Sequence, residues 1–361
     1  MRIVQLIDSL DVGGAEKIAI NFTNALNDKI DFSGIISTRK EGDLIHSIEN
    51  RENYFFLNKK HALDYKSIFV LRNFCVKNKI EFIHAHGTSF FTAFLLKLFF
   101  LKVKILWHDH SGARSSQRLM QNKMLWFCSK LFYGIITVNN DLEFWCKEKL
   151  NFKNVIYLPN FTTFTTAEQK TTVLQGFDNK RILSLANLRN PKNHKLLIEV
   201  AIEIVKKHKD WTFHLIGKDY NDDYSNDLKE IIKGNNLENS IFLYGLKNDI
   251  KNIIEQAEIC VFTSTSEGLP VALLEYGLLK KAVISTKVGE IQFIIKNNQN
   301  GLLVNSKDST EFFNSLVKLI EHEELRIKFG NNLYKTIIEN NSQDAIITTY
   351  LKWLKKDNGK S

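Results

Sequence analysis

Two acidic residues on either side of a bend are the strongest chemical signal in the sequence. They lie in Ser264-Thr-Ser-Glu-Gly-Leu-Pro-Val-Ala-Leu-Leu-Glu275, where Glu267 precedes Gly268 and Pro270, and Glu275 follows eight residues after Glu267. Carboxylates accept hydrogen bonds from hydroxyl groups, and backbone N–H groups at a helix start suit a phosphate. The residue types therefore suggest a nucleotide-sugar site. For a bare pair of this spacing, two solvated glutamates near a helix start would be the commoner interpretation.

The elements around this stretch would place it at the edge of a sheet. An apolar run from Ile259 to Thr263 predicts a strand, Gly268 and Pro270 predict a loop, and a helical pattern begins at Val271. In an open α/β sheet, ligands bind beyond the carboxyl ends of the strands. Glu267 should therefore lie in a ligand-facing loop, and Glu275 should lie in the following helix.

A basic loop with the same placement occurs earlier in the second half of the chain. Asn187, Arg189 and Lys192 lie between a predicted strand, Arg181 to Leu185, and a predicted helix, Lys195 to Lys207. Cations just before a helix can hold a diphosphate leaving group. Solvated loop cations are the alternative, with about equal weight on the sequence alone.

Two motifs in the first half also follow predicted strands. Gly13-Gly14-Ala-Glu16 could bring backbone N–H groups close to an anion, or could be a plain strand-to-helix turn. The second motif is a repeated histidine pair, His84 with His86 and His108 with His110. We expect no metal site there, because neither an acidic nor a cysteine-rich partner set accompanies the histidines.

The phrase Ser-x-x-Glu-Gly-x-Pro, with a second Glu eight residues after the first, resembles the donor-site signature of glycosyltransferase family 4. This family contains retaining enzymes of the two-domain GT-B fold. The resemblance implies that Glu267 lies near the transferred sugar, that Glu275 accepts from ribose hydroxyls, and that Lys192 binds phosphate. Asn187 stands where the family usually has an Arg, and Arg189 could supply that charge.

The same resemblance extends to other positions. It implies a donor-binding role for Gly268, Leu269, Gly217 and Gly245, and an acceptor-site role for the loop with Gly13, Gly14 and Glu16. One histidine of the second pair, His108 or His110, should contact the transferred sugar, and the sequence leaves open which. The expected catalytic set is thus Glu267, His108 and His110. We expect no metal and no cofactor, with a UDP-sugar favoured over a GDP-sugar as donor substrate.

Alternating strands and helices predict two parallel α/β domains, as in the GT-B fold, facing each other across a cleft. The predicted division is an acceptor domain at 1–160, a linker at 161–180, a nucleotide-sugar domain at 181–340, and a C-terminal helix at 341–361 that crosses back to the first domain. The predicted helices include Ser116 to Phe132, and the last stretch, Glu321 to Lys355, is predicted to be long, helical and polar.

Composition is that of a globular protein, with 361 residues, 44% hydrophobic and 25% charged. The net charge of +9 is uneven, because residues 1–160 hold 22 Lys and Arg against 15 Asp and Glu. This excess suggests an anionic membrane surface or a phosphate-bearing acceptor. Nucleic acid is disfavoured, since no nucleic-acid-binding motif accompanies the charge.

Location follows from the same sequence features. Met1 to Asp8 predicts a strand rather than a signal peptide, and the four cysteines show no C-x-x-C spacing. We therefore expect reduced thiols and a cytoplasmic protein, with peripheral attachment to the cytoplasmic face of the membrane left open.

The resulting prediction is a glycosyltransferase that moves a sugar from a nucleoside diphosphate sugar to a hydroxyl of a glycan or a lipid-pyrophosphate-linked saccharide, in cell-surface polysaccharide synthesis. The alternatives are a sugar-nucleotide epimerase or hydrolase of the same fold, and a binding protein without turnover. A nicotinamide oxidoreductase is disfavoured, because the G-x-G-x-x-G fingerprint is absent.

Overall fold

The computed structural model describes residues 1–111, 114, 117–164 and 170–356. Several predicted features fall partly outside this range: the start of the predicted helix Ser116 to Phe132, Gly112 beside the second histidine pair, residues 165–169 of the predicted linker, and residues 357–361. The chain divides into two compact units, one of Met1–Thr163 with Ser342–Ser361 and one of Phe164–Asn341.

The first unit is built on a parallel sheet with the strand order β3-β2-β1-β4-β5-β6-β7, seven strands among the residues described. Its strands are β1 (Arg2–Ser9), β2 (Phe32–Lys40), β3 (Tyr54–Phe56), β4 (Phe82–His86), β5 (Lys104–Asp109), β6 (Phe132–Thr137) and β7 (Val155–Tyr157). Its α-helices are α1 (Gly14–Leu26), α2 (Tyr65–Lys77), α3 (Phe90–Phe99), α4 (Lys123–Ser129), α5 (Asn140–Glu148) and α13 (Gln343–Lys356). Short 3-10 turns lie at Asp43–Ser47, Arg51–Asn53, Gly87–Ser89 and Leu119–Asn122.

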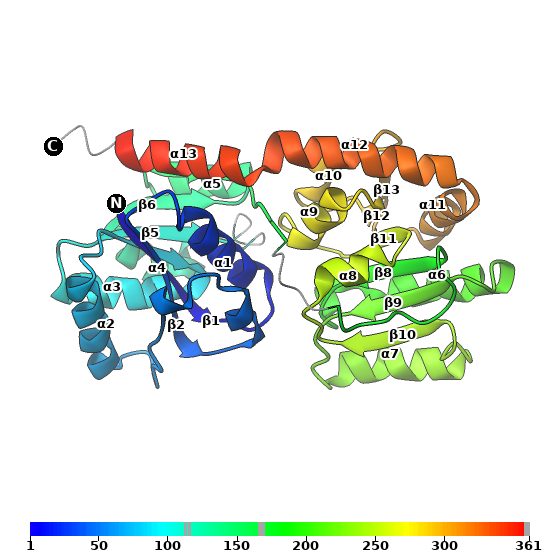
Figure 1. Cartoon of the computed structure of the whole chain (residues 1–361), viewed down its shortest axis with the longest axis horizontal. Helices are drawn as coiled ribbons and strands as arrows, with labels where there is room; N and C mark the ends of the chain where they lie inside the picture. Colours follow the sequence, from blue (N-terminus) through cyan, green and yellow to red (C-terminus); the bar gives the residue numbers. More distant parts are fainter. Residues whose placement is uncertain (112–113, 115–116, 165–169, 357–361) are drawn as a thin grey trace. The chain divides into compact units, whose positions relative to one another are not determined.

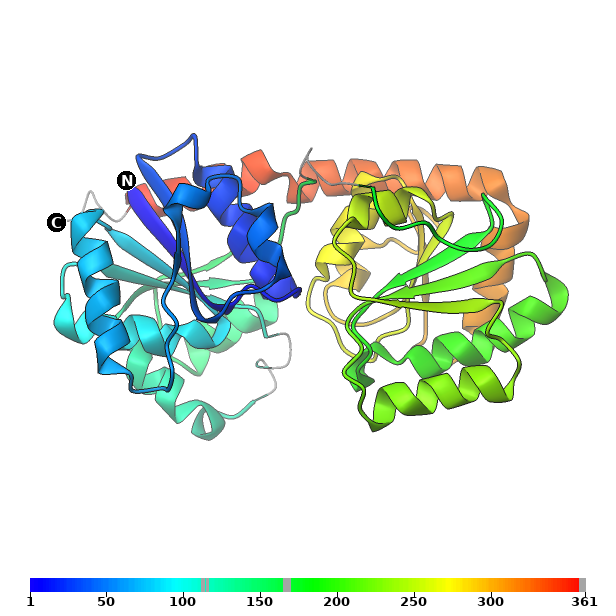
Figure 2. The ribbon, with the colours of Figure 1, turned by 60° about the horizontal axis from the view of Figure 1, so that its bottom comes forward.

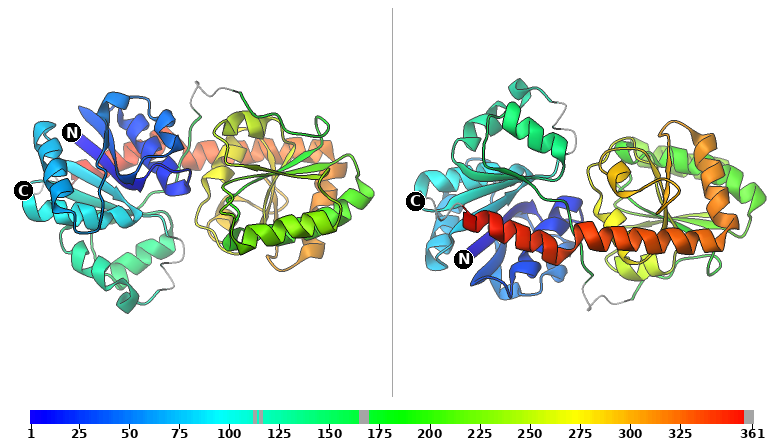
Figure 3. Two further views of the ribbon diagram at one scale, coloured as in Figure 1. Left: turned by 90° about the horizontal axis from the view of Figure 1, so that it is seen from below. Right: turned by 90° about the horizontal axis from the view of Figure 1, so that it is seen from above.

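Helices cover both faces of this sheet, as its continuous apolar strands require. Helices α2 to α5 pack on one face around Trp107, and α1 packs on the other around Leu10. Helix α13 lies beside α1 (Figure 3, right, red beside blue), and Tyr350 is fully buried there. The predicted return of the C-terminal helix to the first domain is confirmed.

The second unit has a parallel sheet with the order β10-β9-β8-β11-β12-β13, six strands within the described part of the chain. Its strands are β8 (Arg181–Leu185), β9 (Thr212–Ile216), β10 (Ile241–Gly245), β11 (Ile259–Phe262), β12 (Ala282–Thr286) and β13 (Leu302–Val304). Its helices are α6 (His194–Lys207), α7 (Asp223–Gly234), α8 (Ile250–Glu255), α9 (Val271–Leu278), α10 (Ile291–Ile294), α11 (Ser309–Glu321) and α12 (Glu323–Asn341), with a 3-10 turn at Asn190–Lys192.

Figure 2 shows the strands of this unit between α6 and α7 on one side and α9 on the other. The core on the α6 side contains Phe213 and Phe312, and the core on the α9 side contains Leu273 and Tyr276. In this sheet the order reverses between β8 and β11, which creates the switch point where an open α/β sheet binds ligands. The predicted fold of two parallel α/β domains is confirmed.

One predicted helix is wrong in extent. The predicted helix Ser116 to Phe132 is a 3-10 turn at Leu119–Asn122 followed by the short α4, and Phe132 already belongs to β6. Asn122 interrupts the helix, because its buried amide donates to Gln117 Oε1 and Arg118 O and its oxygen accepts from Arg114. Phe132 pairs with β5, so the apolar run after it extends the sheet.

The polar C-terminal stretch contains the expected boundary before the C-terminal helix predicted at 341–361. It divides at Ser342 into α12 and α13, which belong to different units. The Ser342 hydroxyl accepts from Ala345 N at 3.4 Å and so caps the start of α13.

All four cysteines are free and buried, as expected of reduced core thiols. Burial raises the pKa of Cys75 to about 12 and the pKa of Cys128 to about 11, so these thiols stay protonated.

Candidate functional site

In the second unit, the stretch around Glu267 forms the predicted strand, loop and helix. Strand β11 ends at Phe262, the loop follows, and α9 begins after Pro270, whose fixed φ suits a helix start. The loop is held from the next strand, because Thr286 Oγ1 donates to Ser264 O at 2.6 Å. The backbone of Gly289 packs closely against the loop. Gly289 has a φ of +51°, and a Cβ added there would lie 1.8 Å from Glu267 O.

The structure brings Glu267 and Lys192 into direct contact. Lys192 Nζ lies 2.5 Å from Glu267 Oε1, although the residues are 75 positions apart in the sequence. Their loops are joined by two further bonds, from Thr263 Oγ1 to Lys192 O at 2.9 Å and from Thr265 N to Pro191 O at 2.9 Å. The basic loop and the acidic loop therefore form one site at the carboxyl ends of β8 and β11.

The charges of this site are mostly shielded from solvent. The side chain of Lys192 is 15% exposed and that of Glu267 is 9% exposed. Ser264 Oγ donates to the same oxygen of Glu267 at 2.6 Å, and no described residue donates to Oε2. An ammonium group carries three donors, so Lys192 can bind an anion as well as Glu267. The pair can thus present a cation to a phosphate and a carboxylate oxygen to a hydroxyl.

Glu275 lies one helical turn into α9 and is buried, with 4% of its surface exposed. The next residue anchors the helix to the sheet, because Tyr276 Oη accepts from Leu185 N at 2.9 Å. Leu269 is buried in the core under the loop. Gly268 has open space where a Cβ would be, so the unliganded fold itself does not require glycine there.

The other residues expected in the donor site hold strand ends together. Asn187 Oδ1 accepts from Lys218 N at 2.8 Å, and Gly217 N donates to Gly245 O at 3.0 Å. A Cβ on Gly217 would lie 2.1 Å from Ala186 O, so the two loops can approach only with glycine at this position. Arg189 is exposed at the start of the turn that contains Lys192.

In the first unit, the Gly13-Gly14 motif forms the start of α1. Gly13 is the N-cap in an extended conformation, and Glu16 lies in the first turn. The Glu16 carboxylate folds back over Gly13, and an added Cβ there would lie 2.3 Å from Glu16 Oε2. Glu16 thereby places a negative charge at the positive end of the helix dipole.

The two histidine pairs form one cluster, here called the histidine array: His84, His86, His108 and His110. The cluster forms because alternate residues of a strand share a face and because β4 pairs with β5. His84 Nε2 lies 3.2 Å from His108 Nδ1, and His86 Nδ1 lies 2.9 Å from His110 Nε2. The rings of His84 and His86 stack with centroids 4.4 Å apart, and those of His108 and His110 are tilted with centroids 4.1 Å apart.

Neighbouring residues hold both ring nitrogens of His86. Gln5 Oε1 lies 2.9 Å from His86 Nε2, and His110 Nε2 lies 2.9 Å from His86 Nδ1. His110 is half-buried, whereas His108 is 1% exposed. Of the second pair, His110 is therefore the residue that solvent reaches.

Burial keeps the whole array neutral. Desolvation lowers the pKa of His110 to about 3, and it lowers the pKa of His84, His86 and His108 well below the usual value. Tyr350 Oη from α13 lies 3.2 Å from His84 Nδ1, and Phe22 packs edge-on against His84. A neutral imidazole can hydrogen-bond a hydroxyl without adding charge to the site.

Ring nitrogens of His84, His86 and His108 lie within 4.8 Å of one another, which raises the question of a metal. A zinc ion needs lone pairs that converge at about 2.0–2.1 Å. The rings of His84 and His86 are stacked with centroids 4.4 Å apart and an interplanar angle of 18°, so their lone pairs lie in separate, nearly parallel planes and do not meet at one point. The observed arrangement is instead that of hydrogen-bonded imidazoles, with His108 Nε2 and Gln5 Nε2 buried without a partner among the described residues.

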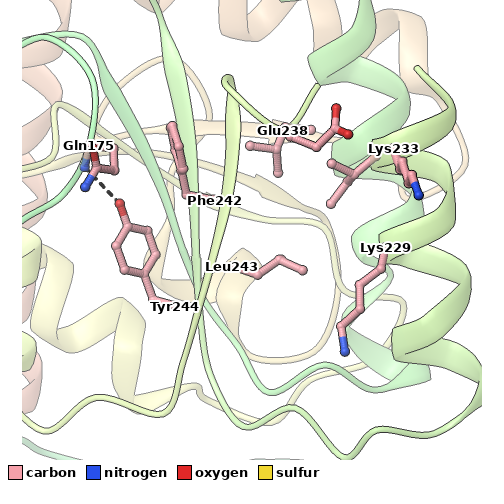
Figure 4. A pocket seen from close by; sticks show the side chains of 9 residues that line it. Gln175, Lys229, Lys233, Glu238, Phe242, Leu243 and Tyr244 are labelled. Carbon is pink, nitrogen blue, oxygen red and sulfur yellow. Dashed lines mark hydrogen bonds between the residues drawn. The ribbon is translucent and has the colours of Figure 1, made fainter. Parts of the chain in front are cut away.

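A pocket of about 440 Å³ lies elsewhere in the second unit, over β10 and α7 (Figure 4). Its lining includes Tyr244, whose hydroxyl accepts from Gln175 N at 2.9 Å, with Phe242 and Lys229. The residues predicted from the sequence are absent from this lining, so the candidate site rests on Lys192 and Glu267.

Sequence reasoning missed Gln5 and Tyr350 as supports of the histidine array. A signal for Gln5 was present, because it is the polar residue inside the apolar run of β1 and is fully buried. Tyr350 had no local signal, since it reaches His84 only through the return of α13.

Comparison with known proteins matches both halves of the chain. The family model described as glycosyltransferase family 4 matches residues 12–162, and the model described as glycosyl transferases group 1 matches residues 168–336. The chain belongs to glycosyltransferase family 4. An uncharacterized glycosyltransferase of Haemophilus influenzae is 24% identical to this family 4 chain over 88% of it and 90% of the relative.

Two further relatives have described activities. A UDP-Gal:alpha-D-GlcNAc-diphosphoundecaprenol alpha-1,3-galactosyltransferase of Escherichia coli is 23% identical over 91% of this glycosyltransferase and 89% of the relative. A poly(ribitol-phosphate) alpha-N-acetylglucosaminyltransferase of Staphylococcus aureus is 27% identical over 62% of this chain and 50% of the relative.

Solved structures share the fold of this family 4 glycosyltransferase. HepE of Anabaena, in complex with UDP-glucose, has a TM-score of 0.79 at 15% identity and covers 99% of this chain and all of its own. TarM of Staphylococcus aureus has a TM-score of 0.78 at 16% identity and covers 98% of this chain and 99% of its own.

In the described part of this chain, each helix is too short or too polar to cross a membrane.

Proposed function

We propose that this glycosyltransferase transfers a sugar from a UDP-sugar to a hydroxyl of a glycan or a lipid-pyrophosphate-linked saccharide, with retention of anomeric configuration, in cell-surface polysaccharide synthesis. One observation carries the proposal: the contact between Lys192 and Glu267, which joins a cation and a carboxylate at the switch point of the second sheet. The named substrates of the Escherichia coli and Staphylococcus aureus relatives support the acceptor classes.

In this proposal, Lys192 binds the diphosphate of the donor, with Arg189 adding charge from the same loop. Breaking the bond between the anomeric carbon and the phosphate oxygen leaves negative charge on the diphosphate, which a fixed cation stabilises. Glu275 accepts from the ribose hydroxyls, and Gly268 leaves room for the sugar. The UDP preference is supported by neighbours of the same fold that bind UDP or UDP-glucose.

Glu267 positions the sugar rather than attacking it. Its Oε1 is already bonded to Lys192 and Ser264, so Oε2 is the atom that can accept from a sugar hydroxyl. The acceptor hydroxyl attacks on the face from which the phosphate leaves, and a departing phosphate oxygen takes its proton. Of the two candidate histidines, we assign the sugar contact to His110, because it is half-buried whereas His108 is 1% exposed.

The loop with Gly13, Gly14 and Glu16 is proposed to shape the acceptor site. Glu16 already supplies the negative charge at the start of α1, so this loop suits a neutral sugar hydroxyl better than a second phosphate. The reaction is proposed to need no metal, because Lys192 supplies the leaving-group charge. Activity that persists in a chelator would agree with this, and activity restored only by a divalent cation would not.

Thermal shift with a panel of UDP, GDP, ADP and CMP sugars tests the donor assignment. We expect stabilisation by UDP-sugars and its loss in Lys192→Ala. A product assay with and without acceptor then tests the reaction class. Conversion of the donor alone would favour an epimerase or hydrolase, and binding without turnover with any acceptor would favour a non-catalytic protein.

We further propose that the protein is cytoplasmic and works at the cytoplasmic face of the membrane.

A further inference from the structure

One side of the first unit combines exposed apolar side chains with positive charge. It consists of the outer faces of α2, of α3 with the turn after it, and of α4 with the 3-10 turn before it; these are here called the α2–α4 surface (Figure 1). Its most exposed large hydrophobic residues are Tyr65, Phe69, Val70, Val76, Leu98, Phe99, Leu101, Met120, Met124, Trp126 and Phe127. Single exposed apolar residues are ordinary, but a group of this size on adjacent helices is not.

Contacts between the helices make this surface continuous. The rings of Phe69 on α2 and Phe99 on α3 lie 5.2 Å apart, and Arg72 Nε donates to Phe99 O at 3.1 Å. On the other side of α3, the rings of Phe94 and Phe127 lie 5.7 Å apart. The apolar side chains therefore share one side of the unit rather than being scattered over it.

Charge on this surface has one sign. Helices α2, α3 and α4 and the turn Leu119–Asn122 contain no Asp and no Glu, although 40 of the 361 residues are acidic. Their basic residues are Lys66, Arg72, Lys77, Lys97 and Lys123, and Lys79, Lys102 and Lys130 follow α2, α3 and α4 within three residues. Lys130 Nζ lies 4.0 Å from the centroid of the Trp126 ring, which places a cation and an amphipathic ring at the same point.

We propose that the α2–α4 surface docks on a bilayer that contains anionic phospholipids. Leucine, methionine and aromatic side chains can enter the boundary between headgroups and acyl chains, while lysine and arginine reach the phosphates around them. Tryptophan is enriched at that depth in membrane proteins. A protein partner would need acidic residues to match the basic ones, but the long apolar side chains between the lysines match hydrocarbon. The proposal names the surface behind the membrane location proposed above, and it does not rest on the donor site.

Flotation of the full chain with vesicles tests this surface. We compare vesicles of phosphatidylcholine alone with vesicles of equimolar phosphatidylcholine and phosphatidylglycerol, at low and high salt. Wild type should float with the anionic vesicles, and the bound fraction should fall as salt shortens the Debye length. Lys66→Gln and Lys123→Gln should each weaken binding by about fivefold, since one cation near an anionic surface is worth roughly 1 kcal/mol.

Leu101→Glu tests the apolar part, and Val173→Glu is its matched control. Both positions are 74% exposed, and Val173 belongs to the second unit. We expect Leu101→Glu to reduce vesicle binding at least about tenfold, with binding by Val173→Glu unchanged. Thermal unfolding checks that both variants fold. Stabilisation by UDP-sugars should be normal in both, so a failed membrane proposal is distinguishable from a failed donor proposal.

Three results would overturn the proposal. The first is wild type that fails to float with anionic vesicles at low salt, and the second is an equal loss of binding in Leu101→Glu and Val173→Glu. The third is a dimer that light scattering detects without vesicles and that Leu101→Glu dissociates. That result would mean that a second copy of the chain, rather than a bilayer, covers this surface.

Discussion

Replacing Glu267 by Gln removes one charge from the candidate site while keeping the shape of the side chain. In the protein as it stands, Glu267 Oε1 accepts from Lys192 at 2.5 Å and from Ser264 at 2.6 Å, and both charged side chains are mostly buried. The amide can still accept from Ser264. It can no longer neutralise Lys192, so the variant separates the electrostatic role of Glu267 from its role in packing.

The structure gives the expected magnitudes. Loss of a charged hydrogen bond costs about 1.5–3 kcal/mol, and because Lys192 keeps some solvent contact we expect about 1.5 kcal/mol less stability in the second unit. Binding of UDP should change in the opposite direction. A diphosphate at about 5 Å from a carboxylate is repelled by about 3 kcal/mol per charge at an effective dielectric constant near 20. After partial screening, we expect UDP to bind Glu267→Gln about tenfold more tightly, equivalent to about 1.4 kcal/mol.

Catalysis should nevertheless fall. If Glu267 orients the sugar in the transition state, its loss should reduce kcat by about a hundredfold or more, as for other preorganised polar groups. Calorimetric titration with UDP, a transfer assay with labelled donor sugar, and urea unfolding measure the three effects. Glu199→Gln is the control, because it makes the same chemical change on an exposed position of α6. Weaker UDP binding with unchanged transfer in Glu267→Gln would refute this reasoning.

Further substitutions and pH test the rest of the structure. Gly289→Ala should destabilise the second unit by about 2 kcal/mol or more, because its Cβ would collide with Glu267 O at a positive φ; Gly268→Ala, with open space, should change stability by less than about 0.5 kcal/mol yet weaken UDP binding. Trp353→Ala should lower the free energy of unfolding of the first unit by about 2–3 kcal/mol, because the indole packs against Gly134 and donates to Asn154 Oδ1 at 2.8 Å. Urea unfolding measures this loss, with Lys352→Ala at the exposed neighbouring position as the control. The histidine array is uncharged when folded, so its contribution to stability is complete above about pH 6.5 and is lost on acidification, as the unfolded chain takes up protons. For His110 the loss extends down to its folded pKa of about 3. The free energy of unfolding should fall by up to about 1.4 kcal/mol per pH unit for each histidine, and a urea midpoint that is flat between about pH 7 and about pH 5 would contradict this.

Much of the candidate site could be predicted because its signals are local. A strand, a Gly-Pro bend and a helix are encoded within residues 259–279, and the cation of the basic loop follows a strand in the same way. Parallel strands end at the same edge of a sheet, so the two loops could be expected to be neighbours. Their hydrogen bonds could not, because the bonds depend on which side chains meet when the loops pack.

The predicted helix over Ser116 to Phe132 failed for a similar reason. Its local composition favours a helix, but the amide of Asn122 is held by residues of the preceding loop, and Phe132 joins β6. By contrast, the predicted start of the C-terminal helix at 341 lies next to the break at Ser342, which separates helices that pack on different units.

The sequence alone determined the alternation of strands and helices, the loops at their carboxyl ends, and the acid-free composition of α2 to α4, because these are properties of neighbouring residues. Tertiary structure decided that Lys192 pairs with Glu267, that His110 rather than His108 is the half-exposed histidine, and that Tyr350 supports the array. These outcomes depend on burial and on contacts between distant segments. Neither exists until the sheets have formed and the helices have packed on them.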